Sequence, residues 1–150
     1  MTSASCILCP QDFSPCSEAA LARACELARA LGQSIELMHV YQLNYYFPDP
    51  VIGMDAAMTL EGLETIRKRA EEMLEEQRRR VEALGLRASV RLEEGNPASL
   101  IAQRSSAPEI SMVVMGTHGR KALGRLLLGS VAEHVVRAAH APVMTVRLAD

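Results

Sequence analysis

The residues best suited to chemistry in this sequence are glycines and a serine at fixed spacing near the C-terminal end. Gly116 and Gly119 directly follow a short apolar segment, residues 110–115, and the pair Gly129-Ser130 comes after nine further residues. Glycine lets a backbone amide approach a ligand closely, and the first amides of a helix, together with its dipole, favour an anion. Three basic residues lie between the glycines, namely Arg120, Lys121 and Arg125. The pattern therefore predicts a strand, a phosphate-binding loop and a helix.

An ordinary structural role for the same residues is the alternative. Glycine is frequent wherever a chain turns after a strand, a Gly-Ser pair can serve as a helix N-cap only, and loop arginines are usually solvated. Short glycine motifs also match by chance. The complete spacing, Gly-x2-Gly-x9-Gly-Ser, is more demanding than either half. Phosphate binding is therefore the hypothesis to test.

Composition and charge limit the classes of protein that the chain can represent. Its 150 residues are 49% hydrophobic and 23% charged, which predicts one globular domain over residues 1–150. A net charge of −2 gives no support for a nucleic-acid partner. No apolar run approaches the about 20 residues of a membrane helix, and the first residues lack the positive start of a signal peptide. We therefore expect a cytoplasmic protein with no membrane partner.

Strand-like and helix-like segments alternate along the chain. The predicted strands cover residues 6–9, 35–40, 88–92, 110–115 and 141–147, and the predicted helices cover 15–31, 60–84, 97–105 and 131–139. Ser14 and Asn96, each followed by proline, are typical N-caps, and Gly32 is a typical C-terminal stop. The alternation predicts an α/β fold: a five-stranded open parallel sheet with helices on both faces, and ligands beyond the carboxyl ends of the strands.

Helical spacing also predicts which side chains of the first two helices face inward. In the first helix these are Leu21, Ala24, Leu27, Ala28 and Leu31, and in the second Leu63, Ile66, Ala70, Met73, Leu74, Val81 and Leu84. Ion pairs Glu75–Arg79 and Glu76–Arg80 are expected along the outer face of the second helix. The run Arg78-Arg79-Arg80 in this helix is therefore interpreted as part of a solvated face, not as a nucleic-acid surface.

Two features of the N-terminal third have alternative interpretations. Cys6 and Cys9 form a CxxC motif that could be redox-active or contribute to a zinc site. They also lie in a predicted buried strand, where side chains three apart point to opposite faces, which favours small buried thiols. The irregular segment 41–58 holds all three tyrosines, and it could cover a ligand, cover a partner subunit or simply lie on the sheet.

Taken together, the motifs resemble the universal stress protein family over essentially the full chain. The matching pieces are residues 10–14, 39–40, 95–97, 115–120, 126–131 and 141–143. The family divides on its glycine signature, and this sequence is similar to the members that bind ATP. The resemblance implies a Rossmann-like, adenine nucleotide alpha hydrolase-like fold with strand order 3-2-1-4-5.

The resemblance further implies roles for individual residues. Asp12 would lie by the ribose or the phosphates, and Val40 would recognise adenine through its backbone. Gly129, Ser130 and Val131 would hold the β- and γ-phosphates. The other implied nucleotide-binding residues are Pro10, Met115, Gly116, Gly119 and Arg120. The cofactor would be ATP, or else ADP or AMP, and a magnesium ion between the phosphates would fit.

Three functions are compatible with these residues. The first is a stress-response regulatory protein that binds ATP as a homodimer and changes its surface or partners with occupancy. The second is a slow ATPase or other adenine-nucleotide hydrolase, but His39 and His118 lack a sequence partner that would position a base, so no catalytic residue is predicted. The third is a redox or metal sensor that uses Cys6 and Cys9.

The homodimer is predicted from the last strand. That strand would run from Val143 to Arg147 at the edge of the sheet, and it presents apolar side chains. An apolar edge strand is a liability unless another chain covers it.

Overall fold

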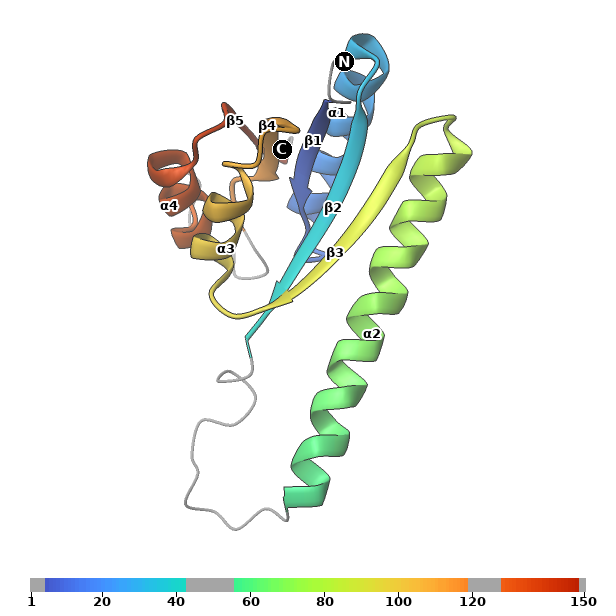
Figure 1. Ribbon diagram of the computed structural model, residues 1–150, viewed down its shortest axis with the longest axis vertical. Coiled ribbons are helices and arrows are strands. Elements are labelled where there is room, and N and C mark those ends of the chain that lie inside the picture. Colours follow the sequence, from blue (N-terminus) through green and yellow to red (C-terminus); the bar gives the residue numbers. More distant parts are fainter. Residues whose placement is uncertain (1–4, 43–55, 119–127, 149–150) are drawn as a thin grey trace.

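The chain forms a five-stranded parallel sheet with helices on both faces (Figure 1). The computed structural model describes residues 5–42, 56–118 and 128–148. The strands are β1 (Cys6–Pro10), β2 (Ser34–Tyr41), β3 (Ala88–Glu94), β4 (Ile110–Gly116) and β5 (Val143–Val146). The helices are α1 (Pro15–Leu31), α2 (Ala56–Ala83), α3 (Pro97–Arg104) and α4 (Ser130–Ala138). The strand order β3-β2-β1-β4-β5, with every neighbouring pair parallel, confirms the predicted fold.

The core consists of two apolar layers, one on each face of the sheet. Strand residues alternate between the layers, as the pleat requires: Ile35 and Leu37 of β2 face α1 and α2, whereas Met38 and Val40 face α3 and α4. β1 is buried along its whole length, which is usual for a central parallel strand. The carboxyl ends of β1, β2 and β4 therefore lie at one edge of the sheet, with helices above and below.

The predicted helix caps are confirmed. The Ser14 side chain accepts a hydrogen bond from the amide of Ser17, and the Asn96 side chain accepts one from the amide of Ser99. Gly32 adopts the left-handed conformation, with φ at 68°, that ends α1. These features form from residues close in sequence, so local chemistry is enough to specify them.

Some predictions for the helices are wrong. Leu31 and Leu84 are exposed (55% and 54%) because Leu31 is the last residue of α1 and Leu84 lies beyond the end of α2. The pairs Glu75–Arg79 and Glu76–Arg80 are replaced, since Glu75 pairs with Arg78 and Arg80 reaches Glu18 of α1. A neighbouring helix thus offers Arg80 a carboxylate that the sequence of α2 alone does not reveal.

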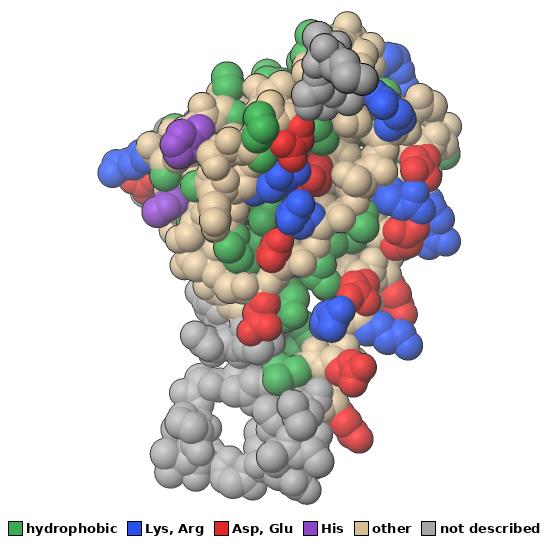
Figure 2. Space-filling model, in the orientation of Figure 1, with side chains coloured by type: hydrophobic (Ala, Val, Ile, Leu, Met, Phe, Trp, Pro, Cys, Tyr) green, Lys and Arg blue, Asp and Glu red, His purple; other side chains and the backbone are tan. Residues whose placement is uncertain are grey.

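Charged side chains of both signs alternate along the outer side of α2 (Figure 2). On the face shown in Figure 2 they form no basic surface along this helix, which agrees with the interpretation of its arginine run as solvated. None of the helices in the described residues has the length and apolar character needed to span a bilayer.

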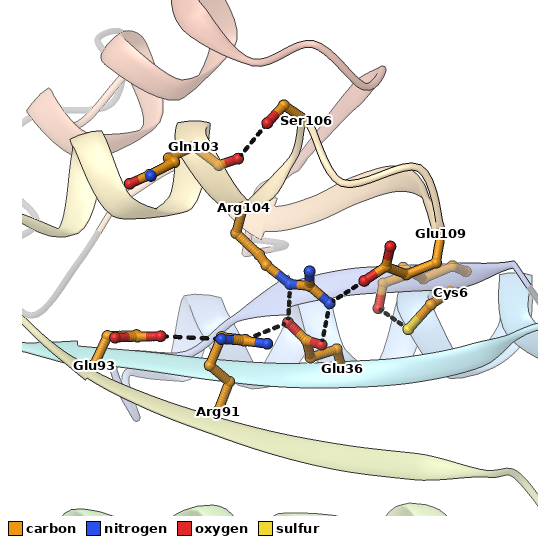
Figure 3. A network of polar contacts seen from close by, with 9 residues as sticks. Cys6, Glu36, Arg91, Glu93, Gln103, Arg104, Ser106 and Glu109 are labelled. Carbon is orange, nitrogen blue, oxygen red and sulfur yellow. Dashed lines mark hydrogen bonds and ion pairs between the residues drawn. The ribbon is translucent and has the colours of Figure 1, made fainter.

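A partly buried ion cluster around the buried Glu36 carboxylate joins α3 to the sheet (Figure 3). The Glu36 carboxylate of β2 accepts two hydrogen bonds of 2.7 Å from the Arg104 guanidinium of α3 and one of 3.1 Å from Arg91 of β3. Arg104 also pairs with Glu109 at 2.7 Å, and the pKa of Arg104 is raised chiefly by its hydrogen bond to Glu36. Because charges in the interior need partners, this cluster fixes α3 relative to β2 and β3.

Candidate nucleotide site

A cavity of about 150 Å³ lies where the carboxyl ends of β1, β2 and β4 meet the first turns of α3 and α4. Several predicted site residues line this strand-end cavity, namely Pro10, Asp12, Val40, Met115, Gly116, Gly129 and Val131. Ser130 is exposed next to them and is not part of the lining. Gly119 and Arg120 lie outside the described residues. The cavity is at the sheet edge where parallel α/β proteins bind ligands, as the sequence predicts.

The cavity has further lining residues that the sequence motifs did not indicate. Met38 stands two positions before Val40, so the alternation of β2 could have predicted it on the same face. Ile101 comes from α3, and no sequence signal connects it to the glycine motif. Together with the predicted Val40 and Met115, these buried side chains give one side of the cavity an apolar wall. Such a wall suits a flat, mostly apolar ring.

The turn between β1 and α1 forms the second wall. The Asp12 carboxylate accepts a hydrogen bond of 3.0 Å from the amide of Ser14, which fixes it at the start of α1. Phe13 has φ at +61°, a left-handed conformation that is unfavourable for a residue with a side chain. The Phe13 ring packs against the His39 ring in a tilted arrangement, with 4.7 Å between centroids, and His39 Nδ1 lies 2.7 Å from the carbonyl oxygen of Gln11. The structure thus holds this wall in a conformation that the chain would not adopt by itself.

A backbone hydrogen bond connects Gly129 with Thr117, the residue that follows Gly116. The amide of Gly129 donates to the carbonyl oxygen of Thr117 at 2.7 Å, and the amide of Thr117 donates to Val146 of β5 at 3.0 Å. The Gly129 amide is therefore satisfied within the protein. The amides that lack a helical acceptor belong to the first turn of α4, at Ser130, Val131 and Ala132. These amides, next to the cavity, are the anion-binding groups that this end of the site provides.

The structure requires glycine at one of the two described glycines of the motif, Gly116, but the backbone does not require glycine at the other, Gly129. A Cβ atom on Gly116 would lie 2.9 Å from Cys16 Sγ and 3.0 Å from the Cys16 carbonyl carbon. Gly116 is therefore required where β4 approaches α1, whatever the cavity binds. Gly129 has φ −60° and ψ 155°, which any residue adopts, so its backbone conformation does not require glycine.

His118 is the histidine that lines the cavity. Its Nδ1 lies 3.0 Å from Thr117 Oγ1, so one ring nitrogen has a partner within the loop. Its Nε2 is buried and has no hydrogen-bond partner among the described residues. A ligand atom in the cavity could satisfy this nitrogen, whereas nothing in the described part of the cavity positions His118 as a base.

The cysteines lie among the described residues and are buried and unpaired. Cys6 and Cys9 belong to opposite core layers, as the strand pleat predicts. Burial raises the pKa of the Cys6, Cys9 and Cys25 thiols, to about 12 for Cys9. In residues 5–42, 56–118 and 128–148, no three His, Cys, Asp or Glu side chains are grouped so that they could hold a metal ion.

Comparison with known proteins decides the family. The model of the universal stress protein family matches residues 5–147. The chain belongs to the universal stress protein family. Universal stress protein MJ0531 of Methanocaldococcus jannaschii is 30% identical over 142 residues, which cover 94% of this chain and 81% of that protein. A universal stress protein of Thermus aquaticus is 34% identical over 146 residues and is covered to 97%, against 94% of this chain.

Solved structures of universal stress proteins share the fold. The structure of MJ0577 from M. jannaschii superposes with a TM-score of 0.81 at 23% identity and covers 99% of both chains. A universal stress protein in complex with cAMP has a TM-score of 0.68 at 22% identity, covering 97% of this chain and 98% of that one. One from Archaeoglobus fulgidus in complex with dAMP has a TM-score of 0.65 at 20% identity, covering 97% and 99%.

Proposed function

We propose that this universal stress protein binds an adenine nucleotide, ATP in the first place, in the strand-end cavity and acts as a regulatory protein within one domain of 150 residues. The observation that carries the proposal is the meeting of an apolar wall, the Asp12 carboxylate and the first turn of α4 in one cavity. Two structures of the same fold contain adenine nucleotides, cAMP and dAMP. Both ligands combine an adenine ring with a phosphate, which is the combination that the two ends of this cavity suit.

The proposed orientation follows from the chemistry of the two ends. The base lies between Met38, Val40 and Ile101, and the backbone of Val40 reads its edge. Asp12 lies by the ribose. The phosphates then meet the free amides at Ser130 and Val131, where the dipole of α4 favours negative charge.

The remaining predicted residues have supporting roles in this proposal. Pro10, Met115 and Gly116 form the walls, and Gly129 keeps the entrance to the α4 amides free of a side chain. Gly119 and Arg120 lie outside the described residues, and their assignment to the phosphates remains the prediction made from the sequence. In the described part of the cavity Asp12 is the carboxylate, and no group of three ligands is present. A magnesium ion would therefore take most of its ligands from phosphate and water, as this ion commonly does.

Isothermal titration calorimetry with ATP, ADP and AMP tests the proposal, with and without magnesium. Binding of at least one of them, and its presence by mass spectrometry in protein purified without added nucleotide, would support it. No heat and no rise in melting temperature with any of the three would contradict it. Release of inorganic phosphate in the same samples distinguishes a binding protein from the slow ATPase.

We further propose a cytoplasmic homodimer that forms through the segment from Val143 to Arg147; the strand within it, β5, ends at Val146, one residue earlier than predicted. β5 is an outer strand of the sheet; Met144 within it is 38% exposed, and Leu148, two residues beyond its end, is 52% exposed. Pairing with a second β5 would cover them. Sedimentation of Met144→Lys should give a monomer where the unmodified chain gives a dimer, and equal sedimentation coefficients for both would contradict the interface.

A further inference from the structure

A buried glutamine of α2 supports the cavity wall from behind. Gln77 is only 3% exposed, and its Nε2 donates hydrogen bonds to Gln11 Oε1 at 2.9 Å and to Glu18 Oε1 at 2.8 Å. Gln11 lies between Pro10 and Asp12 in the wall, and Glu18 lies in the first turn of α1. One side chain thus connects the long helix to both sides of the β1–α1 turn.

Each polar atom of Gln11 has a hydrogen-bond partner, and the partners come from β1, β2, α1 and α2. Its amide donates to Met38 of β2 at 2.8 Å, and its carbonyl oxygen lies 2.7 Å from His39 Nδ1. Its side-chain Nε2 lies 3.2 Å from both Cys9 Sγ and the Ser17 carbonyl oxygen. Gln77 is the donor to the remaining atom, Oε1. Without Gln77 this buried oxygen would lose its hydrogen bond, which is unfavourable enough to move the side chain.

The rest of the contact between α2 and the core cannot replace this function. The other buried residues of α2 include Ala70, Leu74 and Val81, which are apolar. Apolar contacts are not directional, whereas a hydrogen bond fixes distance and angle. Gln77 also keeps its Oε1 buried without a hydrogen-bond partner among the described residues, a cost that an apolar side chain would avoid. Glutamine at position 77 is therefore less stabilising than an apolar side chain would be, but it makes two directed hydrogen bonds.

We infer that Gln77 is a positioning residue for the nucleotide site: by holding Gln11 it fixes the wall from Pro10 to Asp12, so that affinity for the ligand depends on the docking of α2. The effect on the ligand rests on the proposed function, but the effect on the wall does not. The Glu18–Arg80 pair, at 2.9 Å, extends the same network to the outer surface of α2. A partner or modification that moves α2 would thus change the cavity without entering it.

The test compares Gln77→Met with Val81→Ala. Methionine keeps the length of glutamine but has no N–H group, so Gln11 Oε1 loses its donor. Val81 lies one turn further along the same helix, is 1% exposed, and its truncation weakens the packing of α2 without altering a hydrogen bond of Gln11. Hydrogen exchange at the amides of Gln11 and Ser14 is measured without nucleotide, and AMP and ATP affinities are measured by calorimetry.

We expect exchange at these two amides to be about tenfold faster in Gln77→Met and the affinity about tenfold lower, as for one lost buried hydrogen bond. In Val81→Ala both should match the unmodified chain, although its melting temperature falls. The double variant Gln11→Met/Gln77→Met should bind no more weakly than Gln11→Met alone, because the two amides act through one contact.

Equal exchange of the wall amides in Gln77→Met and Val81→Ala would overturn the inference, since the role of Gln77 would then be only structural. Faster exchange in Gln77→Met with unchanged affinity would also overturn it. If the unmodified chain binds neither AMP nor ATP while the exchange difference persists, the proposed function fails and the control of the wall by Gln77 stands.

Discussion

The amide of Gly129 donates a 2.7 Å hydrogen bond to the carbonyl oxygen of Thr117, and so joins the end of β4 to the start of α4. This bond aligns the free amides of the first turn of α4 with the cavity, because Thr117 is itself bound to β5. The glycine motif is therefore more than two flexible points in the chain. Its described parts are joined by backbone hydrogen bonds into one corner of the site.

The two glycines should respond differently to the same substitution. Gly116→Ala places a methyl group against Cys16, and such overpacking costs about 2 kcal/mol of unfolding free energy. Gly129→Ala fits the observed backbone angles, so its melting temperature should change by less than about 2 °C. We expect Gly129→Ala to lower ATP affinity about tenfold all the same, because the methyl group partly fills the entrance to the α4 amides.

Calorimetric titrations with ATP and urea unfolding of both variants check this prediction. The pair also matters for the test of ATP hydrolysis. Gly116→Ala lowers the stability of the fold as well as altering the cavity wall, so a loss of activity in that variant is not specific to the cavity. Unchanged affinity in Gly129→Ala would indicate that the phosphates do not approach α4.

Removal of Glu36 should destabilise the protein strongly. Glu36→Ala removes the buried carboxylate that accepts hydrogen bonds from both Arg104 and Arg91, and leaves the partly buried Arg104 with Glu109. Breaking an ion pair with one buried member costs about 3 kcal/mol. The matched control is Glu26→Ala, because the Arg23–Glu26 pair is more than half exposed and such pairs contribute at most about 1 kcal/mol. Urea unfolding at neutral pH measures both. A similar loss in the two variants would mean that the cluster does not fix α3.

Acid should weaken the attachment of α2 to α1 through Glu18. The pKa of Glu18 is lowered from 4.5, first by its hydrogen bond to Arg80. A lowered pKa in the folded state gives stability that is present above the unfolded value and is lost as the pH falls through the folded value. The unmodified chain should therefore be more stable than Glu18→Gln at about pH 7, and this difference should shrink below about pH 4. Urea unfolding at both pH values measures it, and a constant difference would contradict the assignment.

The buried thiols should be unreactive in the native state. Burial raises the pKa of Cys9 to about 12, so its thiolate is scarce at neutral pH. Because the folded pKa is the higher one, the stability linked to this thiol is complete below about pH 9 and is lost as the pH rises toward 12. A thiol reagent at about pH 8 should label Cys9 only after denaturation. Rapid labelling of Cys9 in the native protein would contradict this prediction and support the redox-sensor hypothesis.

The sequence by itself determined the elements and their order. Ser14, Asn96 and Gly32 act through neighbours a few positions away, and the apolar patterns separate strands from helices, so local chemistry was sufficient for the caps and the α/β class. The spacing of the glycine motif likewise predicted a site at the edge of the sheet where the cavity lies.

Only the tertiary structure decided what depends on residues far apart in the chain. It set Gly116 against Cys16, gave Arg80 a partner in α1, exposed Leu31, and buried Gln77 behind the cavity wall. A sequence shows which side chains are polar or small. It does not show that Cys16 of α1 makes glycine necessary at position 116, or that Gln11 and Glu18 accept hydrogen bonds from the buried Gln77 side chain. These contacts exist only after the helices have packed on the sheet.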